Sequence, residues 1–230
     1  MADLLTRRKF LTGTAAMTLL CGCQSRPAGA FLDLMGGWNE RFEEMLFSPS
    51  RLAPELPPPA ATDEADFPVY FISSTMPQAP PDWRLRVGGM VARPSVWTLD
   101  HLRAFESTEM RVEHHCVEGW SAVASWRGVR VSEIARLVKI DPRVRYVEFR
   151  SFDSGYWSGW DLASAMHPQT LLAYDMNGHP LEAEHGAPVR VYSAAKLGYK
   201  NVKYLTEVNF LPNKVGGYWE DQGYEWFAGV

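Results

Sequence analysis

Alternating apolar and polar positions recur in short runs over most of the chain and predict a protein built mainly of β-strands. In Trp83 to Val87, apolar side chains alternate with arginines, as in a strand with one buried face. Four further runs are strand candidates: 144–152, 170–176, 188–193 and 204–211. Asn177-Gly178 follows the second of these runs and predicts a hairpin turn, because both residues tolerate a positive φ.

Three stretches show the periodicity or the caps of helices. Apolar residues three or four apart over 31–47 predict an amphipathic helix that packs on the main body. Thr98 is the expected N-cap of TLDHLRAF, and Ser132 that of SEIARLV, which has to end by Asp141-Pro142. No strand, glycine loop and helix unit of the GxGxxG or P-loop kind occurs, so a nucleotide-binding core is not expected. The expected fold class is α+β with mostly strand.

The first residues are typical of an export signal. TRRKFLT, from Thr6 to Thr12, fits the twin-arginine pattern, and the apolar run after it is much shorter than the roughly 20 residues that span a bilayer. Residues 1–23 are therefore expected to be a signal peptide, and 24–66 a helix with a proline-rich, extended wrapping arm. Leu20 to Cys23 also resembles a lipoprotein cleavage box. Either Cys23 becomes a lipidated N-terminus, or ordinary cleavage falls a few residues later.

Composition and charge narrow the function classes. With 46% hydrophobic and 13% aromatic residues, the chain can bury a large core. The formal net charge of -4 and the lack of a Lys/Arg run in the body of the sequence argue against nucleic-acid binding. The twin-arginine route carries proteins that fold before export, commonly around a cofactor. A periplasmic cofactor protein is therefore expected.

Cys116 is the only cysteine of the sequence beyond residue 23, and it stands in EHHCVEGWSAVASWRGV. A zinc site needs three or four Cys/His ligands at paired spacings, whereas the two histidines beside Cys116 would alternate across a strand. A cysteine nucleophile with a histidine base stays open, because any of six histidines could fold close to it.

Four ordered blocks resemble the sulfite-oxidase-like molybdopterin oxidoreductases, nearest to the branch of the periplasmic methionine sulfoxide reductase catalytic subunit. They are HHCVEGWSAVASWRGV, AMHPQTLLAYDMNGHPL, HGAPVRVYSAAKLGYKNVKYL and GGYWEDQGYEWFAGV. The resemblance implies that residues 67–230 form a mostly-β, mixed-sheet molybdopterin-binding catalytic domain. It also implies that the Cys116 thiolate ligates molybdenum beside the dithiolene of one pterin.

The same resemblance implies roles for further residues. Arg190 matches a contact of the pterin phosphate, for which a guanidinium fork is well shaped. Glu118, expected on the same strand face as Cys116, either relays a proton or is a structural carboxylate paired with an arginine. The other cofactor-binding positions that the resemblance implies are Phe71, Ile72, Ser73, Ser151, His185, Asn201, Val202 and Lys203. Aromatic residues such as Trp120 and Tyr156 either shape the substrate entrance or belong to the core.

Together these features predict an exported molybdenum-cofactor oxidoreductase that transfers an oxygen atom from a small S-oxide or N-oxide. VEGWS follows Cys116 where sulfite oxidases carry a basic run, so sulfite is not the expected substrate. The sequence has no CxxCH haem motif and no set of iron–sulfur cysteines. Electrons are therefore expected to pass to or from a membrane b-type cytochrome or a soluble c-type cytochrome. The competing hypothesis is a cofactor-free exported Cys/His hydrolase or binding lipoprotein on the same scaffold.

Overall fold

The computed structural model describes residues 26–230, so the expected signal peptide and lipoprotein box over 1–23 lie outside the described residues. The chain divides into one unit that ends at Met45 and a second that runs from Leu46 to Val230. In the first unit, helix α2 spans Arg26–Leu46 and so begins earlier than predicted. Its packing on the rest of the chain stays a prediction. Within residues 26–230, none of the helices has both the length and the apolar character of a membrane-spanning helix.

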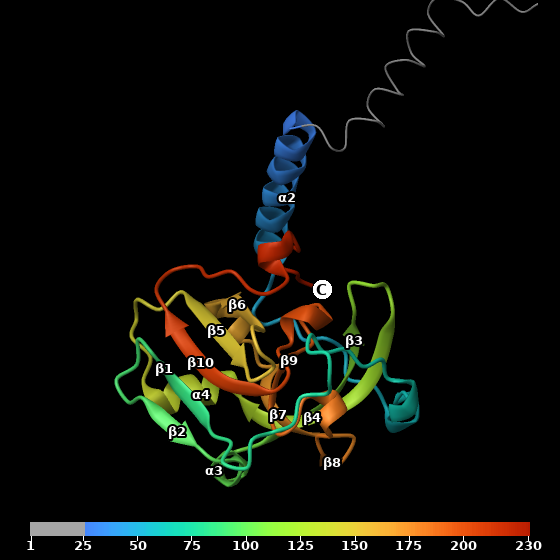
Figure 1. The fold of residues 1–230 in the computed structure, drawn as a ribbon, viewed down its shortest axis with the longest axis vertical. Helices are drawn as coiled ribbons and strands as arrows, with labels where there is room; N and C mark the ends of the chain where they lie inside the picture. Colours follow the sequence, from blue (N-terminus) through green and yellow to red (C-terminus); the bar gives the residue numbers. More distant parts are fainter. Residues whose placement is uncertain (1–25) are drawn as a thin grey trace, which may run out of the picture. The chain divides into compact units, whose positions relative to one another are not determined.

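The first sheet of the larger unit has five strands in the order β2-β1-β10-β5-β6 (Figure 1). Their bounds are Ser95–Trp97 for β2, Leu85–Gly89 for β1, Leu205–Leu211 for β10, Tyr146–Ser151 for β5 and Trp157–Asp161 for β6. β1 pairs with β10 in parallel, and the other neighbours are antiparallel. The strands predicted within 83–87, 144–152 and 204–211 are thereby confirmed, with shifted ends.

The second sheet is antiparallel and runs β3-β4-β7-β8, with β9 also paired to β7. Its strands are Thr108–His115 (β3), Ser121–Arg130 (β4), Thr170–Met176 (β7), His179–Pro180 (β8) and Arg190–Ser193 (β9). The predicted run 170–176 agrees with β7 at both ends. Asn177 and Gly178 form the turn between β7 and β8 with φ values of 50° and 92°, which confirms the hairpin prediction.

The helices of this unit are short. Thr98 caps α3 (Leu99–Ala104) through its side chain, as predicted, and His101 completes a capping box. The prediction that Ser132 caps the next helix is wrong. Helix α4 (Val131–Val138) has Arg130 at its N-cap position and so begins two residues earlier, because Val131 continues directly from β4 and its side chain is fully buried. A last helix, α5, spans Leu162–Ala165.

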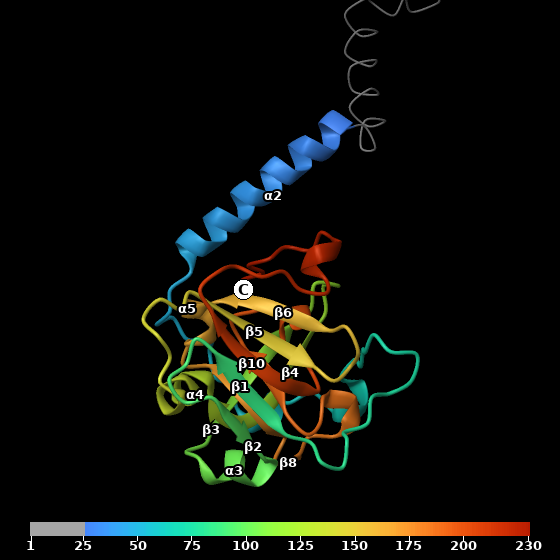
Figure 2. The ribbon, with the colours of Figure 1, turned by 60° about the vertical axis from the view of Figure 1, so that its left-hand side comes forward.

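The arm between Leu46 and the first sheet has the expected extended character. It contains only two single 3₁₀ turns, η2 (Pro58–Ala60) and η3 (Glu64–Asp66). The backbone N–H groups of Leu56 and Thr62 donate to the carbonyl oxygens of Arg111 in β3 and Val123 in β4. The arm therefore runs along the β3–β4 hairpin, beside the loops that build the pocket described next (Figure 2).

Candidate active site

A pocket of about 380 Å³ opens where six loop segments of the larger unit meet. Its walls come from within residues 67–72, 114–120, 151–156, 184–190, 198–204 and 219–224. Nine of the predicted site residues line it: Phe71, Ile72, Cys116, Glu118, Ser151, His185, Arg190, Asn201 and Lys203. Ser73 and Val202 are not among the lining residues. The structure thus brings most of the predicted site together from distant parts of the sequence.

Cys116 lies at the start of a tight turn and not within a strand. β3 ends at His115, the Cys116 N–H donates to the Trp120 carbonyl at 3.0 Å, and Gly119 turns the chain back with a φ of 88°. The thiol is therefore held at the tip of the β3–β4 hairpin. Burial raises the pKa of the Cys116 thiol, and the nearby charge of Glu118 raises it further.

Glu118 reaches the thiol through this turn, so the expectation that it shares a strand face with Cys116 is wrong. One Glu118 oxygen, Oε2, accepts a hydrogen bond from Trp120 Nε1 at 3.0 Å and lies 3.8 Å from the Cys116 sulfur. This carboxylate therefore contacts an indole and a thiol. It does not pair with an arginine of the described residues, although the alternative of a purely structural carboxylate predicts such a pair. A carboxylate beside the thiol is well placed to hold a proton next to the sulfur.

Arg190 lies at the start of β9 and is buried without a counter-ion. Its guanidinium donates to the carbonyl oxygens of His185 at 3.0 Å and Asn201 at 3.2 Å, and it stacks 4.9 Å from the Trp126 ring. Among the described residues no carboxylate pairs with it, and its Nε has no hydrogen-bond partner. Burial lowers the pKa of Arg190 to about 10. A buried, uncompensated cation with a spare donor suits an anionic group in the pocket.

Lys203 is a second cation of this region. Its ammonium donates to the Glu184 carbonyl at 2.9 Å, and burial, with Arg190 nearby, lowers the pKa of Lys203 to about 7. Burial and the same two cations lower the pKa of His185. Gly186 follows with a φ of 104°, and a Cβ there would lie 2.8 Å from the Lys203 side chain. The chain therefore packs tightly around Lys203 and holds it at the pocket wall.

Asp153 organises the wall that contains Ser151 and the loop 71–73. It is buried and accepts hydrogen bonds from the Ile72 N–H, at 3.0 Å, and from the Ser73 hydroxyl. The Ser73 hydroxyl is therefore bonded to a residue of the pocket wall, although Ser73 is not itself among the lining residues. The Ser151 hydroxyl accepts from the Asp153 N–H at 2.8 Å. Sequence reasoning missed Asp153, although RSFDSG, a polar run directly after a strand, could have indicated it.

Asn201 and Val202 differ in position although they are adjacent. Asn201 lines the pocket, and its Oδ1 accepts from the Ser193 N–H at 2.7 Å, which fixes the segment to β9. Val202 packs in the hydrophobic core with no exposed surface, and its N–H already donates to the Lys200 carbonyl. Its side chain is apolar and its donor is used, so the structure gives Val202 no place at the pocket wall.

His114 is a pocket residue that sequence reasoning did not assign to the cofactor. It is buried on β3 among the rings of Phe67, Trp120 and Tyr192, and burial lowers its pKa to about 3. Its Nδ1 has no partner among the described residues. The hydrogen bond of the Cys116 sulfur goes to Glu118 and not to this histidine, so the geometry does not support a Cys/His dyad. Within residues 26–230, no three His, Cys, Asp or Glu side chains gather as a metal site.

A β-rich fold whose pocket holds one thiol, one buried and uncompensated arginine and one partly buried lysine defines a class of protein that can bind an anionic, metal-bearing cofactor. Residues 73–219 match the family described as "Oxidoreductase molybdopterin binding domain", and the chain belongs to this family. It is a molybdopterin-dependent oxidoreductase with a sulfite-oxidase-type, mostly-β fold, as the sequence predicted.

Two similar proteins carry names that concern methionine sulfoxide. A protein of Azospira oryzae named "Putative protein-methionine-sulfoxide reductase subunit YedZ1" is 37% identical over 234 residues, which cover 99% of this chain and 89% of that protein. The "Protein-methionine-sulfoxide reductase catalytic subunit MsrP" of Xanthomonas axonopodis is 33% identical over 154 residues. That match covers 60% of this chain and 48% of MsrP, so it spans about half of that relative.

Among solved structures, the sulfane dehydrogenase SoxCD of Paracoccus pantotrophus is similar in fold. The TM-score is 0.56 with 22% identity, and the match covers 58% of this chain and 39% of that one. At this level of identity, the likeness supports the fold alone.

Proposed function

We propose that this protein is an exported molybdenum-cofactor reductase that removes the oxygen atom of an S-oxide or N-oxide. One observation carries the proposal: the Cys116 sulfur lies on the wall of the same pocket as the buried, uncompensated Arg190. A soft thiolate suits a high-valent metal held by sulfur, and a buried guanidinium suits a phosphate. The sulfoxide reductase names of the two relatives support the reaction class.

The residues present fit such a cofactor. Cys116 would ligate the metal, which when bound supplies the two-electron redox chemistry. Arg190, which is buried, would bind the pterin phosphate, and Lys203, which is partly buried at the pocket wall, would add a second positive charge. Ser151, His185, Asn201 and the segment of Phe71 and Ile72 would contact the pterin from the remaining walls.

Glu118 is proposed to hold and deliver a proton. Removal of an S-oxide oxygen as water consumes two electrons and two protons, and the sulfur product keeps its two carbon substituents. Glu118 lies 3.8 Å from the thiol, so it can pass one proton to the departing oxygen, and solvent supplies the second. The indole of Trp120, bonded to the same carboxylate oxygen, orients it for this role.

The two electrons are proposed to come from a separate cytochrome, either a membrane b-type or a soluble c-type protein. Export to the periplasm by the twin-arginine route, with or without a lipid on Cys23, belongs to the same proposal and rests on Arg7-Arg8 and the Leu20 to Cys23 box. Replacing Arg7-Arg8 by Lys-Lys should leave the precursor in the cytoplasm. Normal export of that variant would contradict the proposed route.

A dye-linked assay tests the reaction. Protein produced in a host that makes the molybdenum cofactor should oxidise a reduced viologen dye when a sulfoxide or an N-oxide is added, and should not oxidise sulfite. The matched control is Cys116→Ala from the same host, which should be inactive. A metal-loaded wild type that oxidises sulfite and reduces no oxide would refute the proposal.

A further inference from the structure

Four aromatic side chains form one continuous wall of the pocket, here called the aromatic wall: Tyr70, Tyr199, Trp219 and Tyr224. The ring centroids are 6.0 Å apart for Tyr70 and Trp219, 4.9 Å for Trp219 and Tyr224, and 5.3 Å for Tyr224 and Tyr199. Such spacings are those of rings in direct contact. Tyr70 comes from the arm, Tyr199 from the segment after β9, and Trp219 and Tyr224 from the segment after β10.

The aromatic wall adjoins the Cys116 turn through Tyr199, because a Cβ on the neighbouring Gly198 would lie 3.5 Å from the carbonyl oxygen of His115. Tyr70 is 58% exposed and Tyr224 is 39% exposed, so the wall reaches the pocket mouth. Glu118 and Cys116 line the same pocket as these four rings. A molecule that enters the pocket between the wall and the thiol can therefore contact the rings.

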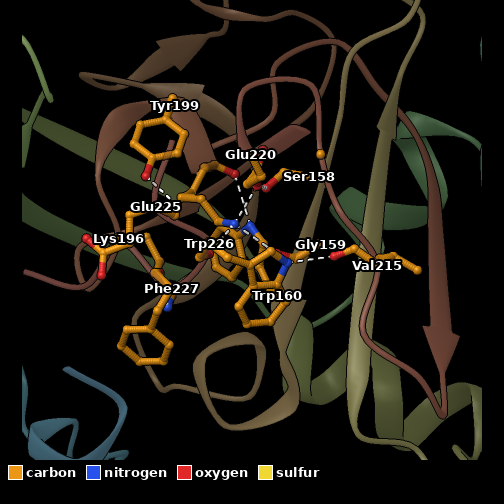
Figure 3. A network of polar contacts seen from close by, with 12 residues as sticks. Ser158, Gly159, Trp160, Lys196, Tyr199, Val215, Glu220, Glu225, Trp226 and Phe227 are labelled. Atoms are coloured by element: carbon orange, nitrogen blue, oxygen red, sulfur yellow. Dashed lines mark hydrogen bonds and ion pairs between the residues drawn. The ribbon is translucent and has the colours of Figure 1, made fainter. Parts of the chain in front are cut away.

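A buried ion pair holds this wall in place. Lys200 and Glu220 are bonded through Nζ and Oε1, and their side chains are 0% and 3% exposed. The Ser158 hydroxyl donates to the same Glu220 oxygen, and Lys200 also donates to the carbonyl oxygens of Gly159 and Trp226. We call Lys200, Glu220 and Ser158 the clasp, of which Figure 3 labels Glu220 and Ser158. It ties the C-terminal segment to β6, directly beside Trp219.

Further bonds fix the segment on both sides of the clasp. Trp226 Nε1 donates to the Val215 carbonyl, and the Tyr199 hydroxyl donates to the Glu225 carbonyl, each at 2.6 Å (Figure 3). One ring of the wall, Tyr199, is therefore bonded to the segment that carries two others. Because breaking a buried ion pair leaves an uncompensated charge, the clasp disfavours any displacement of this segment.

We propose that the aromatic wall selects the substrate by binding an apolar alkyl or aryl substituent on the sulfur or nitrogen that carries the oxygen, with the clasp as its positioning element. This inference rests on the proposed oxygen-atom transfer. Aromatic faces gain from contact with apolar and aryl groups. The Glu118 carboxylate near the wall disfavours small anions at the same place. The preferred substrate class is thus sulfoxides with a bulky apolar arm, ahead of dimethyl sulfoxide.

Binding of a compound that cannot be reduced tests the wall without turnover. Methyl phenyl sulfone is titrated into cofactor-loaded wild type, Trp219→Leu and Tyr224→Leu by calorimetry. Each variant should raise the Kd by about tenfold, which corresponds to about 1.4 kcal/mol. Trp97→Leu, which alters an aromatic residue of β2 in contact with Phe105 and outside the pocket, is the matched control and should keep the wild-type Kd. Equal Kd values for wild type and both wall variants would overturn the inference.

Turnover then tests the clasp separately from the proposed function. Glu220→Gln and the milder Ser158→Ala should raise the KM for methyl phenyl sulfoxide by about three- to tenfold and leave kcat for dimethyl sulfoxide within about twofold. A proportional loss with both substrates would mean that the clasp is only structural and would overturn its positioning role. If loaded wild type reduces neither sulfoxide, the proposed function fails, while the sulfone titration still decides whether the wall binds an aryl group.

Discussion

The backbone N–H of Ile72 donates to Asp153 Oδ2 at 3.0 Å, across 81 positions of sequence. The same carboxylate accepts a hydrogen bond from the Ser73 hydroxyl. The backbone N–H of Asp153 donates to the Ser151 hydroxyl oxygen. One buried side chain thus positions two walls of the pocket, although it is not among the residues that the family resemblance indicated.

Replacing Asp153 by Ala should detach the loop 71–73 from β5. The substitution removes the two carboxylate oxygens that accept from the Ile72 N–H and the Ser73 hydroxyl. The free energy of unfolding, measured by urea denaturation, should therefore fall by about 1–3 kcal/mol. Ser73→Ala removes one of the two bonds and serves as the graded control, with a smaller loss. Identical denaturation midpoints for Asp153→Ala and wild type would contradict this positioning role.

Cys116→Ala should abolish retention of molybdenum while leaving the fold intact. The thiol lies in the turn at the tip of the β3–β4 hairpin and is only partly buried. Its loss should therefore change the unfolding free energy by less than about 1 kcal/mol. Metal analysis and circular dichroism on protein from a cofactor-competent host measure the two effects. Glu118→Gln is the matched variant in the same turn and should keep the metal. Full molybdenum content in the alanine variant would exclude Cys116 as the ligand.

Arg190→Met should separate stability from cofactor binding. Replacing a buried charge by an apolar side chain of similar length is often neutral or stabilising by about 1–4 kcal/mol, whereas the lost donors to two carbonyls work against this gain. We expect cofactor-free protein as stable as wild type to within about 2 kcal/mol, and at least a tenfold lower pterin content.

Arg103→Met is the control for Arg190. Arg103 pairs with Asp175 at 2.5 Å and lies outside the pocket, so its loss should lower stability and leave the pterin content unchanged. The two variants should therefore show opposite patterns. Equal pterin loss in both would show that the effect is one of folding and not of phosphate binding.

Anion binding to cofactor-free protein should depend on pH through Lys203. With a pKa of about 7, this ammonium is already charged below pH 7, so an anion binds there without proton uptake. Above pH 7 the free protein loses the proton and binding has to restore it, so affinity falls by up to tenfold per pH unit.

Sulfate is a suitable probe of this effect because its charge is constant from pH 6.5 to 9. The charged or titratable neighbours of Lys203 are Arg190, Asp153, Glu184 and His185. Arg190 keeps its charge up to a pKa of about 10, and the lowered pKa of His185 leaves it mostly neutral in this range. Calorimetric titration of Lys203→Met should give a flat pH profile. A flat profile in wild type would refute the role of Lys203.

Local sequence signals correctly predicted those helices and strands whose ends are set by neighbouring residues. The apolar run of β7 is bounded by Asn177-Gly178, and the Thr98 cap needs only its neighbours up to His101, so both predictions agreed with the structure. The Ser132 cap failed because the end of β4 and the burial of Val131 set the start of α4. A cap preference of about 1 kcal/mol does not outweigh that packing.

The sequence predicted only those pocket residues that stand in motifs resembling a known family. Cys116 and Arg190 stand in distinctive blocks, whereas Asp153 and Glu220 act through partners 81 and 20 positions away. The polar run RSFDSG marks Asp153 and a resembling block contains Glu220, but the sequence does not show which distant groups these carboxylates bond. Val202 also stands in a motif block, and its side chain fills the core, so a contact between Val202 and the cofactor stays a prediction.

Because the pocket walls are drawn from both ends of the larger unit, from Phe67 to Tyr224, no ribosome-bound fragment lacking the last of these residues can present the complete site. β1 also finds its parallel partner only when β10 has been synthesised. A cofactor that needs all of these walls would therefore be bound only after residues up to Tyr224 have been synthesised and β1 and β10 have paired.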